Sequence, residues 1–337
     1  MRIDEAAPRL GRLRTHLTGR MALGYGLVVG AVTMWSLNAS IARSLLDDGV
    51  SAARLSELRS VGSFALVLIL LAALRPGLLR VERAEIPNLA FLGIAGIGAV
   101  YLTYFVAIDR LQIGVALTLE YLGPLLLLLW LWLARGRRLS ARLWAAMGVS
   151  LAGTFLVVRA YDLGALDALG VGAGLAAAVS YAIYLGSSER AGERNAPATT
   201  LVWAFGFATL MWLAVQPPWT FPFDRFADTE NLLLGLAVIV IGTLLPYGCL
   251  VAAVRHVPAA RAGVVATLEP VLSALFAFLL HDEGLAAVQI VGGAIVLAAV
   301  VWVQNQRPDL AAESIAGSEP ASRGTARAPL VGGERRV

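Results

Sequence analysis

The sequence predicts an all-α integral membrane protein whose ten transmembrane helices form two inverted five-helix repeats. Of its 337 residues, 58% are hydrophobic and only 15% are charged, whereas about 25% are charged in an average soluble domain. The hydrophobic residues gather in continuous runs of helix-spanning length. A short word of sequence also occurs twice, far apart in the chain, and ends each time in a glutamate. These observations exclude a soluble globular fold.

The apolar runs define the expected spans. A hydrocarbon core about 30 Å thick is crossed by about 20 helical residues. Helices are expected because the runs lack the alternation of β-barrel strands and a helix satisfies its own backbone hydrogen bonds. In order, the spans are expected at residues 22–42, 54–74, 88–108, 112–133, 141–159, 166–187, 198–216, 231–253, 259–280 and 285–304.

The flanking segments read differently. Residues 1–20 are basic and lack the apolar core of a signal peptide, so we expect a cytoplasmic N-terminal segment. Residues 306–337 are rich in Ala, Ser, Gly, Pro and Arg without apolar periodicity, so we expect a disordered cytoplasmic tail.

The arginines predict the orientation. All 27 basic residues are Arg, and they gather in the N-terminal segment, in the tail and in the loops after the second, fourth, sixth and eighth spans. The loops between these are poorer in Arg. The positive-inside rule therefore predicts an inner-membrane protein with both termini in the cytoplasm.

The spans divide into two repeats of five, residues 21–159 and 160–305. Because five is odd, the second repeat enters the membrane from the opposite face, which is typical of secondary transporters that bind substrate near the midplane. The repeated word supports this division. Residues 114–120 read Gly-Val-Ala-Leu-Thr-Leu-Glu, and residues 263–269 read Gly-Val-Val-Ala-Thr-Leu-Glu.

Glu120 and Glu269, which close the two words, are the strongest site candidates. At 1.5 Å per residue, each lies about 12–13 Å from the start of its span, near the middle of the membrane. A charge there costs roughly 2.5–3.5 kcal/mol on insertion scales, and ionisable residues at that depth mark functional sites. Each glutamate is expected to exchange a proton or to pair with a substrate amine. The alternative is a protonated side chain that only hydrogen-bonds a neighbouring helix.

Several motifs resemble one known family. The fourth span contains Glu120-Tyr121-Leu122-Gly123-Pro124, the ninth contains Leu268-Glu269-Pro270-Val271, and the first contains Trp35-Ser36-Leu37-Asn38. Together with Arg59 in the second span, they resemble the drug/metabolite transporter superfamily in its two-repeat EamA form, with Ser36 in place of that family's usual Gly. Residues 117–124 look most like the threonine/homoserine exporter branch. The resemblance covers residues 20–305.

The resemblance implies export from the cytoplasm without ATP hydrolysis, through a cavity between the first, third, fourth, sixth, eighth and ninth spans. Substrate-binding or proton-coupling roles are expected for Glu120, Glu269, Asn38, Trp35, Tyr101, Tyr104, Tyr181 and Tyr247. A packing role remains the alternative for the amide and the aromatic residues. Helix breaks are expected at Gly123, Pro124 and Pro270. A structural or gate ion pair is expected for Glu57 and Arg59.

Other chemistry is not indicated. The sequence contains no Lys, which excludes a Walker A motif. The three histidines lack metal-ligand spacing, and the single Cys249 cannot form an intrachain disulfide. Residues 170–174, Gly-Val-Gly-Ala-Gly, lack the strand of a dinucleotide loop. Gly170 and Gly174, like Gly26 and Gly30, are expected to let helices approach closely. We therefore expect no catalytic site, no cofactor, no metal and no enzyme.

Taken together, the sequence predicts a secondary transporter that exports small metabolites by alternating access, with amino acids as the first candidates. One alternative is a multidrug or toxic-cation exporter of the same fold, because two carboxylates also suit a lipophilic cation. An alternative of another class is a membrane-embedded enzyme or sensor. The expected partners are a small-molecule substrate and the lipid bilayer, without nucleic acid. Proton coupling, facilitated efflux and a homodimer all stay open.

Overall fold

The computed structural model describes residues 6–161, 167–281, 284–306 and 313, and all regular structure in these ranges is helical. Nine described helical spans are long and apolar enough to cross a membrane, and Ala141–Val157 is a shorter apolar helix of 17 residues. At 1.5 Å per residue the shorter helix still extends about 25 Å. The predicted spans are therefore confirmed as helices in the expected order.

The first half begins with two continuous helices and continues with two interrupted ones. Its elements are α1 (Ala6–Asp47), α2 (Ala52–Leu74), η2 (Pro76–Leu79), η3 (Arg83–Glu85), α3 (Ile86–Phe91), η4 (Leu92–Gly98), α4 (Ala99–Ile108), α5 (Ile113–Glu120), α6 (Gly123–Leu133) and α7 (Ala141–Val157). The third span is α3–η4–α4, and the fourth is α5–α6.

The second half repeats this order. Its elements are α8 (Ala168–Arg194), α9 (Pro197–Val215), η5 (Pro218–Thr220), η6 (Phe223–Phe226), α10 (Thr229–Ile239), η7 (Val240–Leu244), α11 (Leu245–Ala253), α12 (Ala259–Ala266), α13 (Leu268–His281) and α14 (Ala287–Asn305). The eighth span is α10–η7–α11, and the ninth is α12–α13. The interruptions fall in the third and fourth span of each half, and both η4 and η7 are π-helical.

Local chemistry explains where several helices begin. Ser51, Ser140, Asp167 and Asp228 cap α2, α7, α8 and α10 by accepting a hydrogen bond from a backbone N–H in the first turn. Such caps satisfy groups that a helix start leaves without an intrahelical partner.

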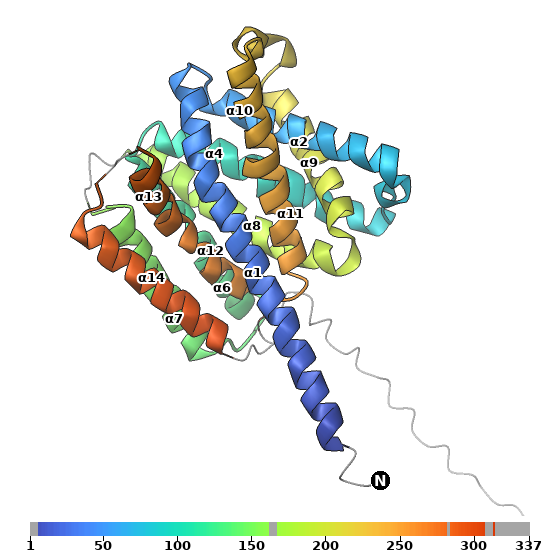
Figure 1. Ribbon diagram of the computed structural model, residues 1–337, viewed down its shortest axis with the longest axis vertical. Helices are drawn as coiled ribbons and strands as arrows, with labels where there is room; N and C mark the ends of the chain where they lie inside the picture. Colours follow the sequence, from blue (N-terminus) through green and yellow to red (C-terminus); the bar gives the residue numbers. More distant parts are fainter. Residues whose placement is uncertain (1–5, 162–166, 282–283, 307–312, 314–337) are drawn as a thin grey trace, which may run out of the picture.

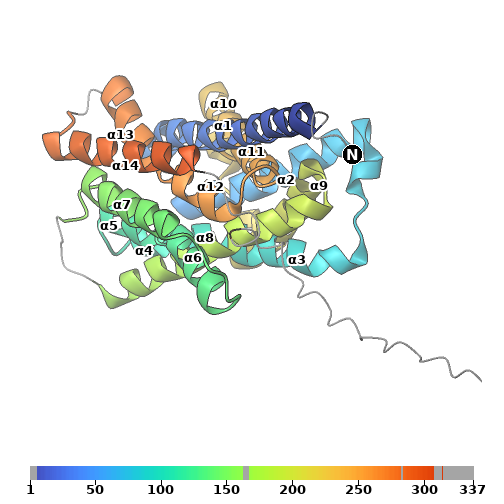
Figure 2. The same cartoon turned by 90° about the horizontal axis from the view of Figure 1, so that it is seen from below.

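The helix contacts respect an exchange of the two halves (Figure 1). The first helix, α1, packs on the eighth and ninth spans, and its counterpart α8 packs on the third and fourth. At the periphery α2 packs on α9, and α7 packs on α14. Figure 2 shows the α7–α14 pair and the α2–α9 pair at opposite ends of the bundle. The first helix of each half is thus inserted into the other half, which places the first, third, fourth, sixth, eighth and ninth spans around the centre.

Glycines allow some of these contacts and not others. A Cβ on Gly153 of α7 would lie 2.8 Å from the Gly292 carbonyl oxygen of α14, and a Cβ on Gly292 would lie 2.7 Å from that of Gly153. The expectation is confirmed for Gly174, which packs closely on Leu119 of α5, whereas Gly170 packs on Leu111 in the loop before α5. The expectation for Gly26 and Gly30 is wrong, because a Cβ on either would meet no atom within 4 Å.

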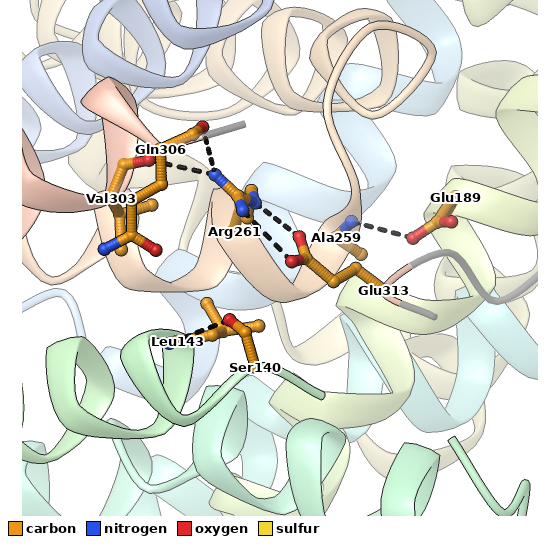
Figure 3. A network of polar contacts seen from close by, with 8 residues as sticks. All are labelled: Ser140, Leu143, Glu189, Ala259, Arg261, Val303, Gln306 and Glu313. Atoms are coloured by element: carbon orange, nitrogen blue, oxygen red, sulfur yellow. Dashed lines mark hydrogen bonds and ion pairs between the residues drawn. The ribbon is translucent and has the colours of Figure 1, made fainter. Parts of the chain in front are cut away.

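Buried polar contacts join one end of the bundle (Figure 3). Glu189 of α8 accepts a hydrogen bond from the backbone N–H of Ala259, the first residue of α12, at 2.7 Å. Arg261 of α12 donates to the carbonyl oxygens of Val303 and Gln306 at the end of α14, at 2.9 Å each. These bonds satisfy terminal backbone groups of two helices that have no further turn to pair with.

Arg261 also holds one residue of the predicted tail. Its guanidinium forms an ion pair with the Glu313 carboxylate, and both side chains are 1% exposed. Apart from Gln306 and Glu313, the segment 306–337 lies outside the described residues. The structure thus describes a contact of the predicted tail, at Glu313. Sequence position beyond the last apolar run could not indicate a partner on α12.

Candidate functional site

The two glutamates lie where their spans are interrupted. Helix α5 ends at Glu120, a turn follows, and α6 restarts at Gly123 with Pro124 in its first turn. Helix α12 ends at Ala266, and Glu269 lies in the first turn of α13. Proline lacks the N–H that a continuous helix would use, so it suits a first turn. An acidic residue in a first turn is also favoured by the helix dipole.

The two carboxyl groups face a common region. Glu120 lies within electrostatic range of both Glu269 and Arg59. Glu269 is likewise within range of Arg59, and the Tyr121 hydroxyl lies near its carboxyl group. Both glutamates are partly exposed. Tyr104 lies within electrostatic range of both carboxyl groups.

Arg59 reaches this region from α2. Its Nε donates to Thr243 Oγ1 at 2.9 Å, and a terminal nitrogen donates to the Gly242 carbonyl oxygen at 2.9 Å. Its guanidinium carbon lies 4.4 Å from the centroid of the Tyr101 ring. Both hydrogen-bond partners belong to the π-helical segment η7.

Aromatic rings form a continuous wall beside the charged groups. The rings of Trp35 and Tyr247 meet edge to face at 5.3 Å, and Tyr247 continues to Tyr184 at 5.0 Å. Tyr184 stacks on Tyr181 at 6.2 Å, and Tyr181 meets Tyr121 at 6.1 Å. The wall therefore runs from α1 through α11 and α8 to the break in the fourth span.

A hydroxyl contact links this wall to the third span. The hydroxyl groups of Tyr101 and Tyr247 are 2.6 Å apart. Because Tyr101 also lies beneath the Arg59 guanidinium, one chain of contacts connects the wall with the arginine.

Two other predicted site residues, Asn38 and Glu57, are buried in contacts with other side chains. Asn38 is 5% exposed, and a Cβ on Gly242 would overlap its side chain, so Asn38 fills the space between α1 and η7. Glu57 is buried and pairs with Arg54 at 2.5 Å, one turn earlier on α2. None of the ion pairs between described residues includes Arg59.

Sequence reasoning missed several members of the site. Tyr184 follows Tyr181 by one helical turn, so helical spacing was a signal that these rings share a face. Tyr121 was visible only as part of the motif around Glu120. Gly242 carries no local signal for its contact with Arg59, because this contact joins α2 to η7.

The two copies of the repeated word differ in burial. Residues 263–268, which lead to Glu269, are all buried. Of the matching residues that lead to Glu120, Val115 and Ala116 are buried, whereas residues 114 and 117–119 are partly exposed. Because successive spans alternate in direction, α5 and α12 start from opposite ends of the bundle. The approach to the glutamates is thus tightly packed along α12 and more open along α5.

Comparison with known proteins assigns the family. A model of the EamA-like transporter family matches residues 22–159 and again residues 168–304. The threonine/homoserine exporter RhtA of Escherichia coli (strain K12) is 30% identical over 291 residues, which is 83% of this chain and 92% of that protein. RhtA of Salmonella typhimurium (strain LT2) is also 30% identical over 291 residues, 84% of this chain and 92% of that protein.

More distant proteins agree. An uncharacterized transporter of Archaeoglobus fulgidus is 26% identical over 217 residues, 64% of this chain and 76% of that protein. A solved crystal structure shares the fold with a TM-score of 0.69 at 20% identity, covering 83% of this chain and 95% of the other. The relatives identified by function are transporters, which agrees with a multi-pass membrane protein that acts on a small molecule within the bilayer. The chain belongs to the EamA-like transporter family.

Proposed function

We propose that this protein exports amino acids, with threonine and homoserine as the first candidates. The proposal rests mainly on one observation. Glu120, Glu269, Arg59 and the tyrosine wall lie together near the interruptions of the fourth and ninth spans. Carboxylates can pair with a substrate ammonium group, and aromatic faces add cation–π attraction. The RhtA relatives, named threonine/homoserine exporters, support the choice of substrate.

The mechanism that we propose is alternating access between the two halves. The helix contacts of one half match those of the other when the two halves are exchanged. This symmetry supports two arrangements, one with the path along α12 packed and the other with the path along α5 packed. The buried α12 and the more open α5 fit the arrangement in which the site opens along α5. With the termini in the cytoplasm, as the arginines predict, this is the outward-open arrangement.

Efflux measurements test the glutamates. Cells loaded with labelled threonine should lose it more slowly when they express Glu120→Gln or Glu269→Gln than wild type, since Gln keeps the shape and hydrogen bonding but removes the charge. Glu230→Gln, an exposed substitution in the first turn of α10, is the matched control. If either glutamate carries a counter-transported proton, its Gln variant should also flatten the dependence of efflux on external pH. Wild-type efflux from both Gln variants would contradict their role.

A cation exporter is the second candidate, and the tyrosine wall beside two carboxylates favours it. It predicts that expression protects cells against lipophilic cations such as ethidium. Protection from ethidium without threonine efflux would replace the first proposal by the second.

A further inference from the structure

Arg59 is positioned by groups that do not neutralise it. Its two hydrogen-bond acceptors are a hydroxyl and a backbone carbonyl, and its third contact is the ring of Tyr101. Thr243 donates its own hydroxyl proton to the Val238 carbonyl at 2.9 Å, so its oxygen is left to accept from Arg59. The guanidinium is therefore fixed in direction while its charge remains available.

Part of the guanidinium is free to bind. An arginine side chain has five N–H donors, and the bonds to Thr243 and Gly242 use only Nε and one terminal nitrogen. The other terminal nitrogen donates to no described residue and is not among the buried atoms that lack a partner. It therefore faces accessible space within a membrane-spanning bundle, where an arginine is costly unless it serves a purpose.

The nearby carboxylates are opposite in charge to Arg59 and do not contact it. Glu120 and Glu269 lie within electrostatic range of Arg59, yet no described ion pair joins either to it. A small molecule with an anionic and a cationic end matches this pair of opposite charges, because each end can make a charge-assisted hydrogen bond about 2.7–2.9 Å long.

We infer that Arg59 binds the carboxylate of the substrate while Glu120 or Glu269 binds its ammonium group, so that the site selects zwitterionic amino acids over amines. The inference deepens the proposed function and rests on it. A zwitterion adds no net charge to the site, whereas an amine without a carboxylate leaves the arginine without its ligand. Arg59 is then a specificity-determining residue rather than a member of a gate ion pair.

Paired ligands test this inference. The full-length protein in lipid nanodiscs is titrated with L-threonine, with L-threoninamide and with 1-amino-2-propanol, which lacks the carboxylate. Wild type should bind threonine at least tenfold more tightly than either analogue. Arg59→Gln should lose most of this preference while its affinity for threoninamide changes less than threefold. Arg59→Lys should retain part of it, since Lys offers a point charge without the fork.

Controls separate binding from folding. Arg80→Gln removes an exposed arginine from a loop and should behave as wild type. If Arg59→Gln does not fold, the wild-type ratio between threonine and threoninamide still decides. A ratio near one, or equal losses of both ligands in a folded Arg59→Gln, would overturn the inference and leave Arg59 as an internal counter-ion of the glutamates.

A further measurement distinguishes a failure of the proposed function from a failure of the inferred role of Arg59. The same acid and amide pairs are measured for leucine, alanine and glutamine. Binding of amides and amino acids alike overturns only the role of Arg59. Binding of no amino acid by wild type overturns both proposals.

Discussion

Glu120 and Glu269 close matching words but have different neighbours. The Glu269 carboxyl group lies near the Tyr121 hydroxyl, and the Glu269 carbonyl oxygen accepts a hydrogen bond from Ser36 at 2.9 Å. Thr267, two residues earlier, contacts Ser150 through its hydroxyl. Glu120 follows a partly exposed segment instead. The two carboxyl groups are thus expected to differ in mobility and in access to substrate.

Two tyrosines of the wall provide a matched test. Tyr121→Phe removes the hydroxyl near the Glu269 carboxyl group and keeps the ring against Tyr181, so we expect threonine efflux to fall several-fold with little loss of stability. Tyr184→Phe is the control, because the buried Tyr184 hydroxyl has no hydrogen-bond partner among the described residues, and its removal relieves a desolvation cost of about 1–3 kcal/mol. Efflux normalised to membrane protein and thermal unfolding measure the effects. Equal efflux from both variants would contradict a role for the Tyr121 hydroxyl.

At the scale of elements, the contact between α7 and α14 depends on two glycines that face each other. Gly153→Ala places a methyl group 2.8 Å from the Gly292 carbonyl oxygen, so the helices must separate. We expect a lower unfolding temperature in detergent. Gly148→Ala, on the same helix but with no atom within 4 Å of the added Cβ, should be neutral or stabilising, because Ala favours a helix by up to about 1 kcal/mol over Gly. A Gly153→Ala variant as stable as Gly148→Ala would refute this packing.

The buried pair of Arg261 and Glu313 links α12 to the segment after α14. Breaking a buried pair by removing one partner typically costs about 3–5 kcal/mol. Truncation after Arg307 should therefore lower the unfolding temperature, whereas truncation after Gly317, which keeps Glu313, should not. Glu313→Gln should have an intermediate effect, since it keeps the hydrogen-bonding group without its charge. Equal stability of the two truncations would show that the pair contributes nothing.

At the scale of the whole molecule, the unequal burial of the two words predicts unequal labelling. Cys249→Ser first removes the native cysteine. On that background, a membrane-impermeant thiol reagent added outside cells should modify Thr118→Cys, which is partly exposed, but not Thr267→Cys, which is fully buried. The reversed pattern would contradict the outward-open arrangement. Equal protection of both would indicate a site closed on both sides.

Local sequence determined the spans and their order. Apolar length is a property of each segment alone, because every span must satisfy its backbone within the same thickness of hydrocarbon. Proline has a local effect as well, so Pro124 and Pro270 indicated the places near which the fourth and ninth spans restart. The glutamates stood out for the same reason, since a charge within an apolar run is visible without a fold.

Other features depended on contacts between distant segments. The π-helical turns of η4 and η7 have no marker in the sequence beyond their glycines. The partners of Arg59 lie on η7, more than half of the chain away, and Glu313 finds Arg261 on α12.

The sequence by itself therefore determined that this is a ten-span membrane protein, and it predicted two carboxyl groups at mid-membrane. Only the tertiary structure decided which side chains surround them, that Arg59 faces neutral partners, and which approach is packed. The physical reason is that burial and hydrogen bonding are properties of pairs of helices. Two nearly identical words acquire different surroundings, because residues 263–268 are all buried whereas residues 114 and 117–119 stay partly exposed.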